Sequence, residues 1–573
     1  MARYPNGEEM SVVSRRSFVK GLAAGGALVG FGGGSPWSGM ASALAQGGRS
    51  PQGVLRGTTF DLSIGEAPMN FTGSTKMAQT INGSVPGPLL RWREGDTVTL
   101  RVANQLDEDT SIHWHGIVLP ANMDGVPGLS FHGIRPRESY TYRFDVRQSG
   151  TYWYHSHSGL QEQRGVYGPL VIEPREPDPI AFDREHVILL SDWTDEDPER
   201  VFRKLKKQSD YYNFHKRTVS DFIRDARRSG VGATVAERSA WGAMRMNPTD
   251  LADVGGATYT HLMNGVTPNG NWTGAFRSGE RVRLRFINGS SMTYFDVRIP
   301  GLKMTVVAAD GQRVHPVTID EFRIATAETF DVIVEPSGQD AFTIFAQAMD
   351  RSAFAAGTLA VREGLHAPVP SLDPRAILTM DEMGHGRDMS AHQGHEMPGM
   401  PTHPASESGN PLVDMQAMMP ASKLDDPGIG LRGNGRRVLT YSDLNSVFTD
   451  PDGRDPSRTI ELHLTGHMER FAWSFDGRPF AEAEPLRLTY GERVRLVLVN
   501  DTMMTHPIHL HGMWSDLEDE NGQFIVRKHT IDMQPGTRRS FRLRADALGR
   551  WAFHCHLLYH MESGMFREVR VEE

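Results

Sequence analysis

A ten-residue pattern that occurs three times constrains the fold of this chain more than any other feature. Each copy begins with a glycine, continues with alternating aliphatic residues and ends with an asparagine nine positions after the glycine. The copies are residues 95–104, 279–288 and 491–500. Alternation with a period of two after a turn glycine is typical of a half-buried β-strand. The repeat therefore predicts an all-β chain with three related β-sandwich domains.

Two of the three copies are followed by a His-x-His pair at the same distance. Nine residues after the asparagine, the first copy leads to His113 and His115, and the third copy leads to His509 and His511. The middle copy has aliphatic residues at both positions. Because side chains at positions i and i+2 of a strand point to the same face, each pair can present two imidazoles to one metal site.

A second His-x-His pair occurs in each of the same two domains. A glycine precedes each pair by five residues, and the pairs are His155-Ser156-His157 and His554-Cys555-His556. One such pair alone could be a polar strand edge. Four pairs placed symmetrically in two repeats, and absent from the third, indicate metal binding. We therefore predict a metal cluster shared between the first and third domains.

Cys555 is the only cysteine of the chain and stands between two of these histidines. His560 and Met565 follow it, and His506 lies upstream. A thiolate, two imidazoles and a weak axial thioether are the ligands of a trigonal blue copper site. We assign His506, Cys555 and His560 to this site, with Met565 axial. In a strand, Cys555 points to the face opposite that of its neighbours His554 and His556, which face the cluster. The backbone between these residues therefore links the two copper centres by a few covalent bonds.

The composition restricts the partners of the chain. Its 573 residues suggest three or more domains. The formal net charge is −9, whereas nucleic-acid binding needs a clustered basic surface. The one basic cluster, at residues 200–228, is interleaved with Asp and Tyr residues, and we interpret it as part of a solvated helical insertion near residues 200–250. We predict no nucleic-acid partner.

The N-terminal residues have the pattern of an export signal. Paired arginines, Arg15 and Arg16, precede a Gly/Ala-rich run at residues 21–34 and a small-x-small motif at residues 43–45. This order is typical of a twin-arginine secretory signal over residues 1–45. The run is too short and too rich in glycine to span a membrane. We therefore expect a periplasmic protein without an integral membrane segment in the mature chain.

Residues 380–419 are rich in methionine and histidine. The segment carries eight methionines and four histidines among glycines and prolines. It has too little apolar periodicity to fold alone, whereas thioethers and imidazoles together suit soft cuprous ions. A flexible linker between domains is the plainer interpretation, and the two are compatible.

The four histidine motifs resemble the four copper motifs of the multicopper oxidases, and the resemblance covers nearly the whole mature chain. It implies three cupredoxin-like Greek-key β-sandwich domains at residues 53–175, 183–365 and 431–573, with a Met/His-rich linker at residues 366–430. It also implies four copper ions: one type 1, one type 2 and two type 3. The histidine assignment that it implies is a type 2 copper on His113 and His509, one type 3 copper on His115, His155 and His556, and the other on His157, His511 and His554.

The same resemblance implies a reaction. A reductant would lose one electron at the Cys555 copper, the electron would pass through His554 and His556, and O2 would be reduced to water at the three-copper cluster. A proton donor is also needed. Asp124 occupies a position that resembles the acidic residue of the family near the cluster, although an ordinary Asp-Gly turn is the alternative.

Within the family, the Met/His-rich segment, the twin-arginine leader and residues 556–565 resemble the periplasmic copper-resistance oxidases of the CopA type. This implies Cu(I) and O2 as substrates and suggests a periplasmic copper chaperone as a partner. One departure is Met561, which stands where related cuprous oxidases have a glutamate. Three alternatives stay open: a laccase-like oxidase of phenols or catechols, a copper-sequestering protein, and a scaffold that has lost its metal.

Overall fold

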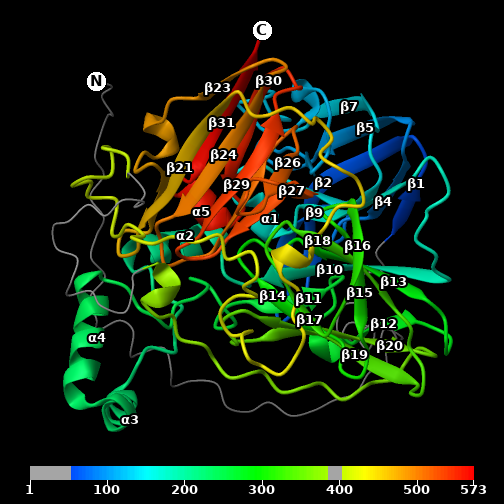
Figure 1. Cartoon of the computed structure of the whole chain (residues 1–573). Helices are drawn as coiled ribbons and strands as arrows, with labels where there is room; N and C mark the ends of the chain where they lie inside the picture. Colours follow the sequence, from blue (N-terminus) through cyan, green and yellow to red (C-terminus); the bar gives the residue numbers. More distant parts are fainter. Residues whose placement is uncertain (1–52, 385–402) are drawn as a thin grey trace, which may run out of the picture. The chain divides into compact units, whose positions relative to one another are not determined.

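The computed structural model describes residues 53–384 and 403–573. The predicted export signal and residues 385–402 of the Met/His-rich segment lie outside these ranges. The described chain forms six β-sheets, which pair into three sandwiches in chain order (Figure 1). The predicted all-β, cupredoxin-like fold is confirmed. The domain boundaries remain a prediction, since residues 47–573 form one compact unit.

The first sandwich consists of a five-stranded and a four-stranded sheet. In sheet order, the strands of the larger sheet are β1 (Val54–Arg56), β4 (Leu89–Arg93), β9 (Tyr167–Glu173), β8 (Gly150–His155) and β6 (His113–His115). The strands of the smaller sheet are β3 (Lys76–Ile81), β2 (Thr59–Met69), β5 (Thr97–Asn104) and β7 (Ser139–Asp145). Strand β2 pairs parallel with β5, so the chain leaves the sheet between them, as Greek-key connections do.

The middle sandwich has six and five strands. Its larger sheet contains β11 (Thr260–Met263), β10 (Arg184–Trp193), β13 (Val282–Asn288), β18 (Thr329–Val334), β15 (Met304–Ala309) and β16 (Gln312–Ile319). Its smaller sheet contains β12 (Trp272–Ala275), β20 (Phe354–Ala360), β19 (Ala341–Ala348), β14 (Phe295–Arg298) and β17 (Glu321–Ile324). Strands β13 and β18 are buried along their whole length.

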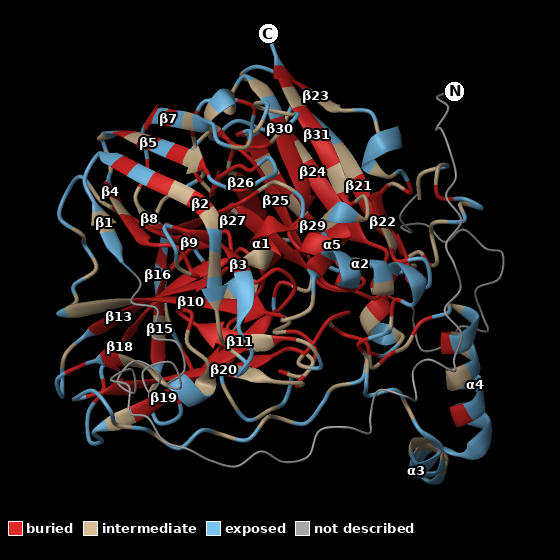
Figure 2. Ribbon diagram, turned by 180° about the vertical axis from the view of Figure 1, so that it is seen from behind, coloured by how far each residue is buried: buried red, intermediate tan, exposed pale blue. Residues whose placement is uncertain are grey.

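The third sandwich repeats the six-plus-five arrangement. Its larger sheet contains β22 (Ala472–Phe475), β21 (Arg458–His467), β24 (Arg493–Asn500), β29 (Arg538–Arg544), β26 (Ser515–Glu518) and β27 (Phe524–Lys528). Its smaller sheet contains β23 (Leu486–Thr489), β31 (Phe566–Glu572), β30 (Gly549–Cys555), β25 (His506–Leu510) and β28 (Thr530–Met533). Burial is concentrated in the strands, as Figure 2 shows. Aromatic pairs join the two sheets of each sandwich, for example Trp92 with Phe144, Phe286 with Phe322, and Phe475 with Phe553.

The repeated asparagine has a structural purpose. The side-chain amides of Asn104, Asn288 and Asn500 are buried at the ends of β5, β13 and β24. Each amide donates to at least two backbone carbonyls beyond its own strand, at 2.8–3.1 Å. A buried amide that satisfies two carbonyls fixes the following loop. In the first and third sandwiches, that loop leads directly into a histidine strand.

Helices lie between β10 and β11, in the region where a helical insertion was predicted. They are α2 (Pro198–Lys207), α3 (Val219–Ser229) and α4 (Val231–Ala243). Asp197 caps α2 through the amide of Glu199, and Thr218 forms a capping box with Asp221 at the start of α3. Helices α3 and α4 expose most of their surface (Figure 2). Within the described ranges, no helix has the length and apolar character that a membrane-spanning helix needs.

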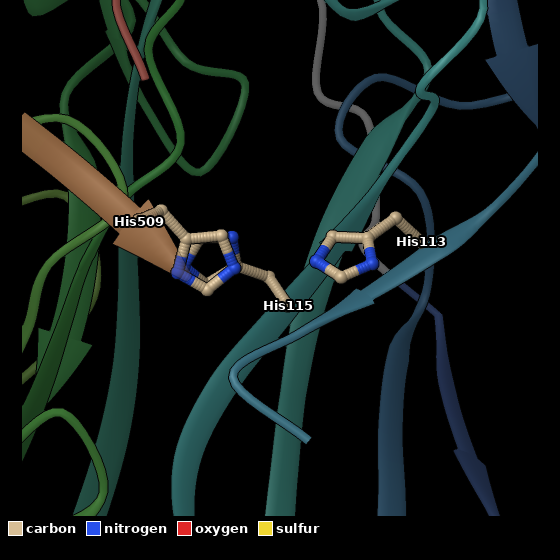
Figure 3. Close-up of side chains that lie close together, drawn as sticks. All are labelled: His113, His115 and His509. Atoms are coloured by element: carbon tan, nitrogen blue, oxygen red, sulfur yellow. The ribbon is translucent and has the colours of Figure 1, made fainter. Parts of the chain in front are cut away.

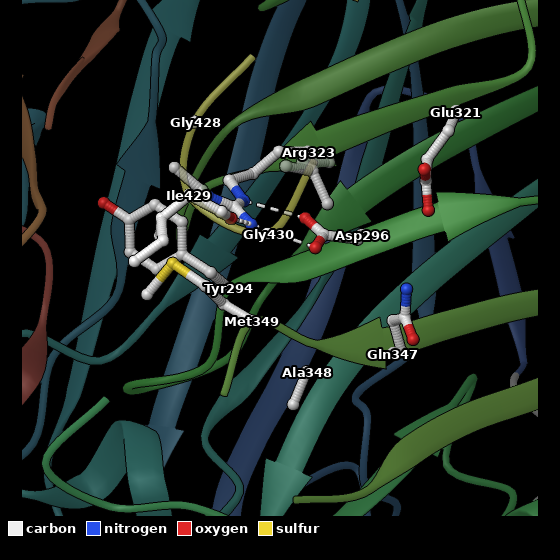
Figure 4. A network of polar contacts seen from close by, with 12 residues as sticks. Tyr294, Asp296, Glu321, Arg323, Gln347, Ala348, Met349, Gly428, Ile429 and Gly430 are labelled. Carbon is white, nitrogen blue, oxygen red and sulfur yellow. Dashed lines mark hydrogen bonds and ion pairs between the residues drawn. The ribbon is translucent and has the colours of Figure 1, made fainter. Parts of the chain in front are cut away.

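The chain after the Met/His-rich segment is fastened to the middle sandwich by a buried ionic network (Figure 4). Arg323 donates to both oxygens of Asp296 at 2.7 and 3.0 Å, and also to the carbonyl of Ile429 at 2.8 Å. Arg351 pairs with the same carboxylate at 2.6 Å. The network therefore holds residues 429–430 against β14 and β17.

Part of the Met/His-rich segment packs into the core, although its sequence does not predict a fold. Met383 is fully buried and Met415 is 7% exposed, and both belong to the main hydrophobic cluster. Packing against the rest of this cluster therefore holds these residues, in spite of the weak apolar periodicity of the segment.

Candidate metal centre

The structure brings together three of the four predicted blue-copper ligands. The Cys555 sulfur lies 3.5 Å from His506 Nδ1 and 3.9 Å from His560 Nδ1, and the two Nδ1 atoms are 3.1 Å apart. All three residues are fully buried. Met565 is buried as well, and its backbone exchanges hydrogen bonds with Cys555 and His560. Its role as the axial ligand stays a prediction.

Strand pairing and one short helix create this group. Strands β25 and β30 are antiparallel neighbours, with Ile508 opposite Cys555, which places His506 next to the cysteine. After β30 the chain turns into α5 (Leu558–Glu562), which carries His560 back over the sulfur. The ring of Trp473 stacks on His560 with 4.1 Å between ring centroids. Packing of this kind fixes ligand geometry before a metal binds.

Hydrogen bonds on the far side of each ring fix the tautomers. His506 Nε2–H donates to the Thr502 hydroxyl at 2.7 Å, and His560 Nε2–H donates to Asp253 Oδ2 at 2.8 Å. Both Nδ1 atoms are thereby left as acceptors that face the sulfur. Burial lowers the pKa of both imidazoles and raises the pKa of the Cys555 thiol. A cation must therefore replace the thiol proton, as copper does on binding.

The eight predicted cluster histidines also converge, from β6 and β8 of the first sandwich, from β25 and β30 of the third, and from the residues directly after β8, β25 and β30. Stacked rings join the two sandwiches: His113 on His511, and His115 on His509, each with 3.8 Å between centroids. Figure 3 shows the His115 and His509 rings overlapping, with His113 opposite them. The groups that could hold one ion each are His113–His115–His509, His115–His155–His556 and His157–His511–His554.

Nitrogen atoms face one another across the centre of this cluster. His157 Nε2 lies 3.3 Å and His511 Nε2 lies 3.1 Å from His554 Nε2. His113 Nε2 and His509 Nε2 are buried and have no hydrogen-bond partner among the described residues. Their Nδ1–H groups donate to the carbonyls of Asp124 and His529, at 2.8 and 2.6 Å. Buried acceptors without partners, aimed at a common point, fit metal ions.

Burial and mutual proximity keep the cluster neutral. Desolvation comes first and neighbouring imidazoles second in lowering the pKa values of His115, His509 and His511. Burial likewise lowers the pKa of His554 to about 4. Neutral imidazole is the form that binds copper. The donor set therefore suits copper at neutral pH.

Asp124 lies against this cluster at the end of η1 (Ala121–Met123) and is fully buried. Its Oδ2 accepts from His511 Nδ1 at 2.8 Å, and its backbone carbonyl accepts from His113 Nδ1. Asp124 thus contacts one histidine of the first sandwich and one of the third. The glycine of the Asp-Gly turn is also required, since Gly125 has φ +83° and a Cβ there would meet the Ile112 carbonyl at 1.8 Å.

Three polar residues at the centre have no motif that singles them out in the sequence. Asp253 contacts His560, as described above. Glu162, in α1 (Gln161–Arg164), is buried with its carboxylate 2.8 Å from His155 Nδ1. His529 Nδ1 lies 3.2 Å from His115 Nε2. Asp253 and His529 reach the centre from loops distant in sequence from the histidines they contact. Glu162 follows His155 by only seven residues, but no recognisable motif marks it.

Comparison with known proteins decides the family. The multicopper oxidase family matches the chain in three segments, residues 63–177, 184–363 and 453–573. The chain belongs to the multicopper oxidase family. This oxidase is therefore an enzyme whose cofactor is copper, and the predicted resemblance is confirmed.

Full-length relatives place the oxidase close to one group within the family. It is 67% identical to the "Copper resistance protein A homolog" of Pseudomonas syringae pv. tomato, over 98% of this chain and 99% of that protein. It is 63% identical to "Copper resistance protein A" of Escherichia coli, over 98% and 99%. A solved structure of Fet3p, a multicopper oxidase that functions in iron import, shares the fold at a TM-score of 0.63 and 17% identity, over 90% of this chain and 91% of that one.

Proposed function

We propose that this oxidase protects against copper by oxidising Cu(I) to Cu(II) and reducing O2 to water. Four cuprous ions release four electrons, and one O2 takes these up with four protons to give two water molecules. The proposal is supported by the relatives at 67% and 63% identity, whose names carry copper resistance. Periplasmic location, export through the twin-arginine segment at residues 1–45 and a copper chaperone as partner belong to the same proposal.

The proposed cofactor is four copper ions, which supply one-electron redox chemistry at one site and four-electron storage in total. His506, Cys555, His560 and Met565 would hold the type 1 ion, and the eight cluster histidines would hold the others, as assigned from the sequence. Cys555 joins the two sites covalently, because both of its neighbours, His554 and His556, face the cluster. Hydrogen bonds hold the outer nitrogens of His506, His560, His113 and His509, so these rings need little reorganisation.

The observation that most favours a metal ion over a phenol as the donor is the burial of His560. Its ring is 0% exposed, so an aromatic donor cannot contact it directly. The outer nitrogen of His560 meets Asp253, which lines a cavity of about 820 Å³. Asp250 lines the same cavity. Asp253 Oδ1 and Asp250 Oδ2 are buried and have no hydrogen-bond partner within residues 53–384 and 403–573.

A carboxylate beside the electron entry point has a chemical use. Oxygen ligands favour Cu(II) over the softer Cu(I). A cuprous ion that reaches Asp253 is therefore a stronger reductant than one held by sulfur. The hydrogen bond from His560 to the same carboxylate gives the electron a short route inward. We assign Asp253 to the docking of the cuprous substrate.

Asp253→Asn is expected to lower kcat/KM for Cu(I) by roughly 10- to 100-fold. Removing the hydrogen-bond partner of a metal-binding histidine usually has an effect of this size. The amide keeps the size of the side chain but removes the carboxyl group that would bind the cuprous ion. The measurement is O2 uptake at varied Cu(I), with the blue absorption recorded to confirm an intact type 1 site. Asp350→Asn is the matched control, since Asp350 lines the same cavity but belongs to the loop after β19. Equal losses in both variants would reject a specific role for Asp253.

The Met/His-rich segment gives a test that separates cuprous oxidation from phenol oxidation. We propose that its thioethers recruit Cu(I). Met389, Met397 and Met400 lie in residues 385–402, so replacing all three with Ser leaves the buried Met383 and Met415 in place. We expect kcat/KM for Cu(I) to fall by roughly tenfold, and turnover of a phenolic donor to stay within twofold. An equal fall with both donors would count against recruitment.

A further inference from the structure

A second cluster of ligating side chains lies outside the copper sites. It consists of His403, Glu407, His463 and Asp501. His403 and Glu407 follow residues 385–402, His463 belongs to β21, and Asp501 follows β24. One potential ligand atom from each residue lies within 4.8 Å of the others. We propose that this cluster is an additional binding site for a divalent transition-metal ion of the Zn²⁺ or Cu²⁺ class.

The distances suit one ion held by four ligands. His463 Nδ1 lies 2.6 Å from Asp501 Oδ2 and 3.8 Å from Glu407 Oε1. His403 Nδ1 lies 3.3 Å from both carboxylates. Tetrahedral ligands at about 2.0–2.2 Å from Zn²⁺ are about 3.3–3.6 Å apart. Small side-chain adjustments are therefore enough to seat an ion.

The cluster is buried and incompletely hydrogen-bonded. The side chains of Glu407, His463 and Asp501 are 0% exposed, and that of His403 is 14% exposed. Glu407 Oε1 has no hydrogen bond to any described residue, and His403 Nδ1 meets the Glu407 and Asp501 carboxylates only as ion-pair contacts at 3.3 Å. In the cluster of eight histidines, His113 Nε2 and His509 Nε2 are likewise buried without a hydrogen bond to any described residue. Buried polar atoms are rarely left in this state without a ligand.

The competing state of these residues is an ion-pair network. Burial alone would lower the pKa of His403, but the carboxylates of Asp501 and Glu407 outweigh it and raise the pKa to about 9. The pKa of His463 is raised in the same way. Two imidazolium groups and one dication carry the same charge, so two carboxylates can balance either. The two states therefore compete for the same four side chains.

The ligand types decide the class of ion. Imidazole and carboxylate suit Zn²⁺ and Cu²⁺, whereas Cu(I) is selected by sulfur ligands, which this cluster lacks. The site would thus take a divalent ion and leave the cuprous substrate to other residues. This inference does not depend on the proposed Cu(I) oxidation.

The position links two functional parts of the chain. Asp501 Oδ1 accepts from the Ala417 amide at 2.6 Å, within the Met/His-rich segment. Thr502, the next residue, accepts from the blue-copper ligand His506. An ion on Asp501 would therefore fasten the end of the Met/His-rich segment to the loop that supports His506.

The test is equilibrium binding of Zn²⁺ to the copper-loaded full-length enzyme, followed by direct metal analysis. We expect Glu407→Gln and His403→Gln to weaken one Zn²⁺ site by at least tenfold. His315→Gln is the control, because His315 is exposed and outside the cluster, and it should bind Zn²⁺ like the wild type. Retained blue absorption shows that each variant is folded. A repeat with Cu²⁺ decides which of the two ions binds more tightly.

X-ray absorption at the zinc edge gives an independent measurement on the unaltered protein. The proposal predicts two imidazole nitrogens and two carboxylate oxygens around the ion. Unchanged Zn²⁺ binding in both variants, or a zinc ion with sulfur ligands, would overturn the proposal and leave the cluster as an ion-pair network.

Discussion

Cys555→Ser is expected to abolish the blue absorption and to reduce O2 uptake with every donor to about one per cent of wild type or less. The hydroxyl is a poor ligand for copper, and the backbone link from the thiolate to His554 and His556 loses its redox-active end. Optical spectra and O2 uptake of the copper-loaded variant check this result. The expected effect is large because Cys555 is the only cysteine and no other thiolate can replace it.

The same variant separates catalysis from sequestration. The eight cluster histidines are unchanged, so the variant should still bind copper at that cluster, which electron paramagnetic resonance can detect. Cells that carry the variant should lose copper resistance if oxidation protects them. Normal resistance in such cells would instead make copper binding the protective function.

Asp124→Asn is expected to slow the reoxidation of the fully reduced enzyme by O2 by roughly 10²- to 10⁴-fold, the usual range for loss of a proton-transfer group. Asp124 is buried and contacts both His511 and His113. The amide can keep these contacts but cannot supply a proton. Stopped-flow mixing of the reduced enzyme with O2 measures the rate directly.

The reduction of the blue site by the donor should be unchanged in Asp124→Asn, since Asp124 does not contact Cys555, His506 or His560. Asp107→Asn is a suitable control, because its carboxylate is 93% exposed in the same sandwich. Reoxidation of Asp124→Asn at the wild-type rate would show that Asp124 has only a structural role, as part of its Asp-Gly turn.

The clustered histidines could be located from the sequence because strand geometry is local. The spacing i and i+2 fixes which side chains share a face, and the repeat fixes which strands correspond. The pairing of His113 with His155, and of His509 with His554, then places the pairs side by side. The fold class followed from the same alternation, since a period of two is incompatible with a helix.

The residues around the ligands could not be found in this way. Asp253 comes from a loop of the middle sandwich, yet it fixes the tautomer of His560 in the third. The burial of Met383 and Met415, and the meeting of His403 with His463, likewise depend on contacts between distant segments. Such contacts are set by tertiary packing, and single-sequence patterns carry no information on it.

The most direct test of Cu(I) oxidation by this enzyme is O2 uptake by the copper-loaded protein with Cu(I) as the donor, beside a phenolic donor without added copper. We expect a much larger kcat/KM for Cu(I), and about four Cu(I) oxidised for each O2 consumed, as four-electron reduction to water requires. Rapid phenol turnover with little response to Cu(I) would contradict it and make this enzyme a laccase-like oxidase.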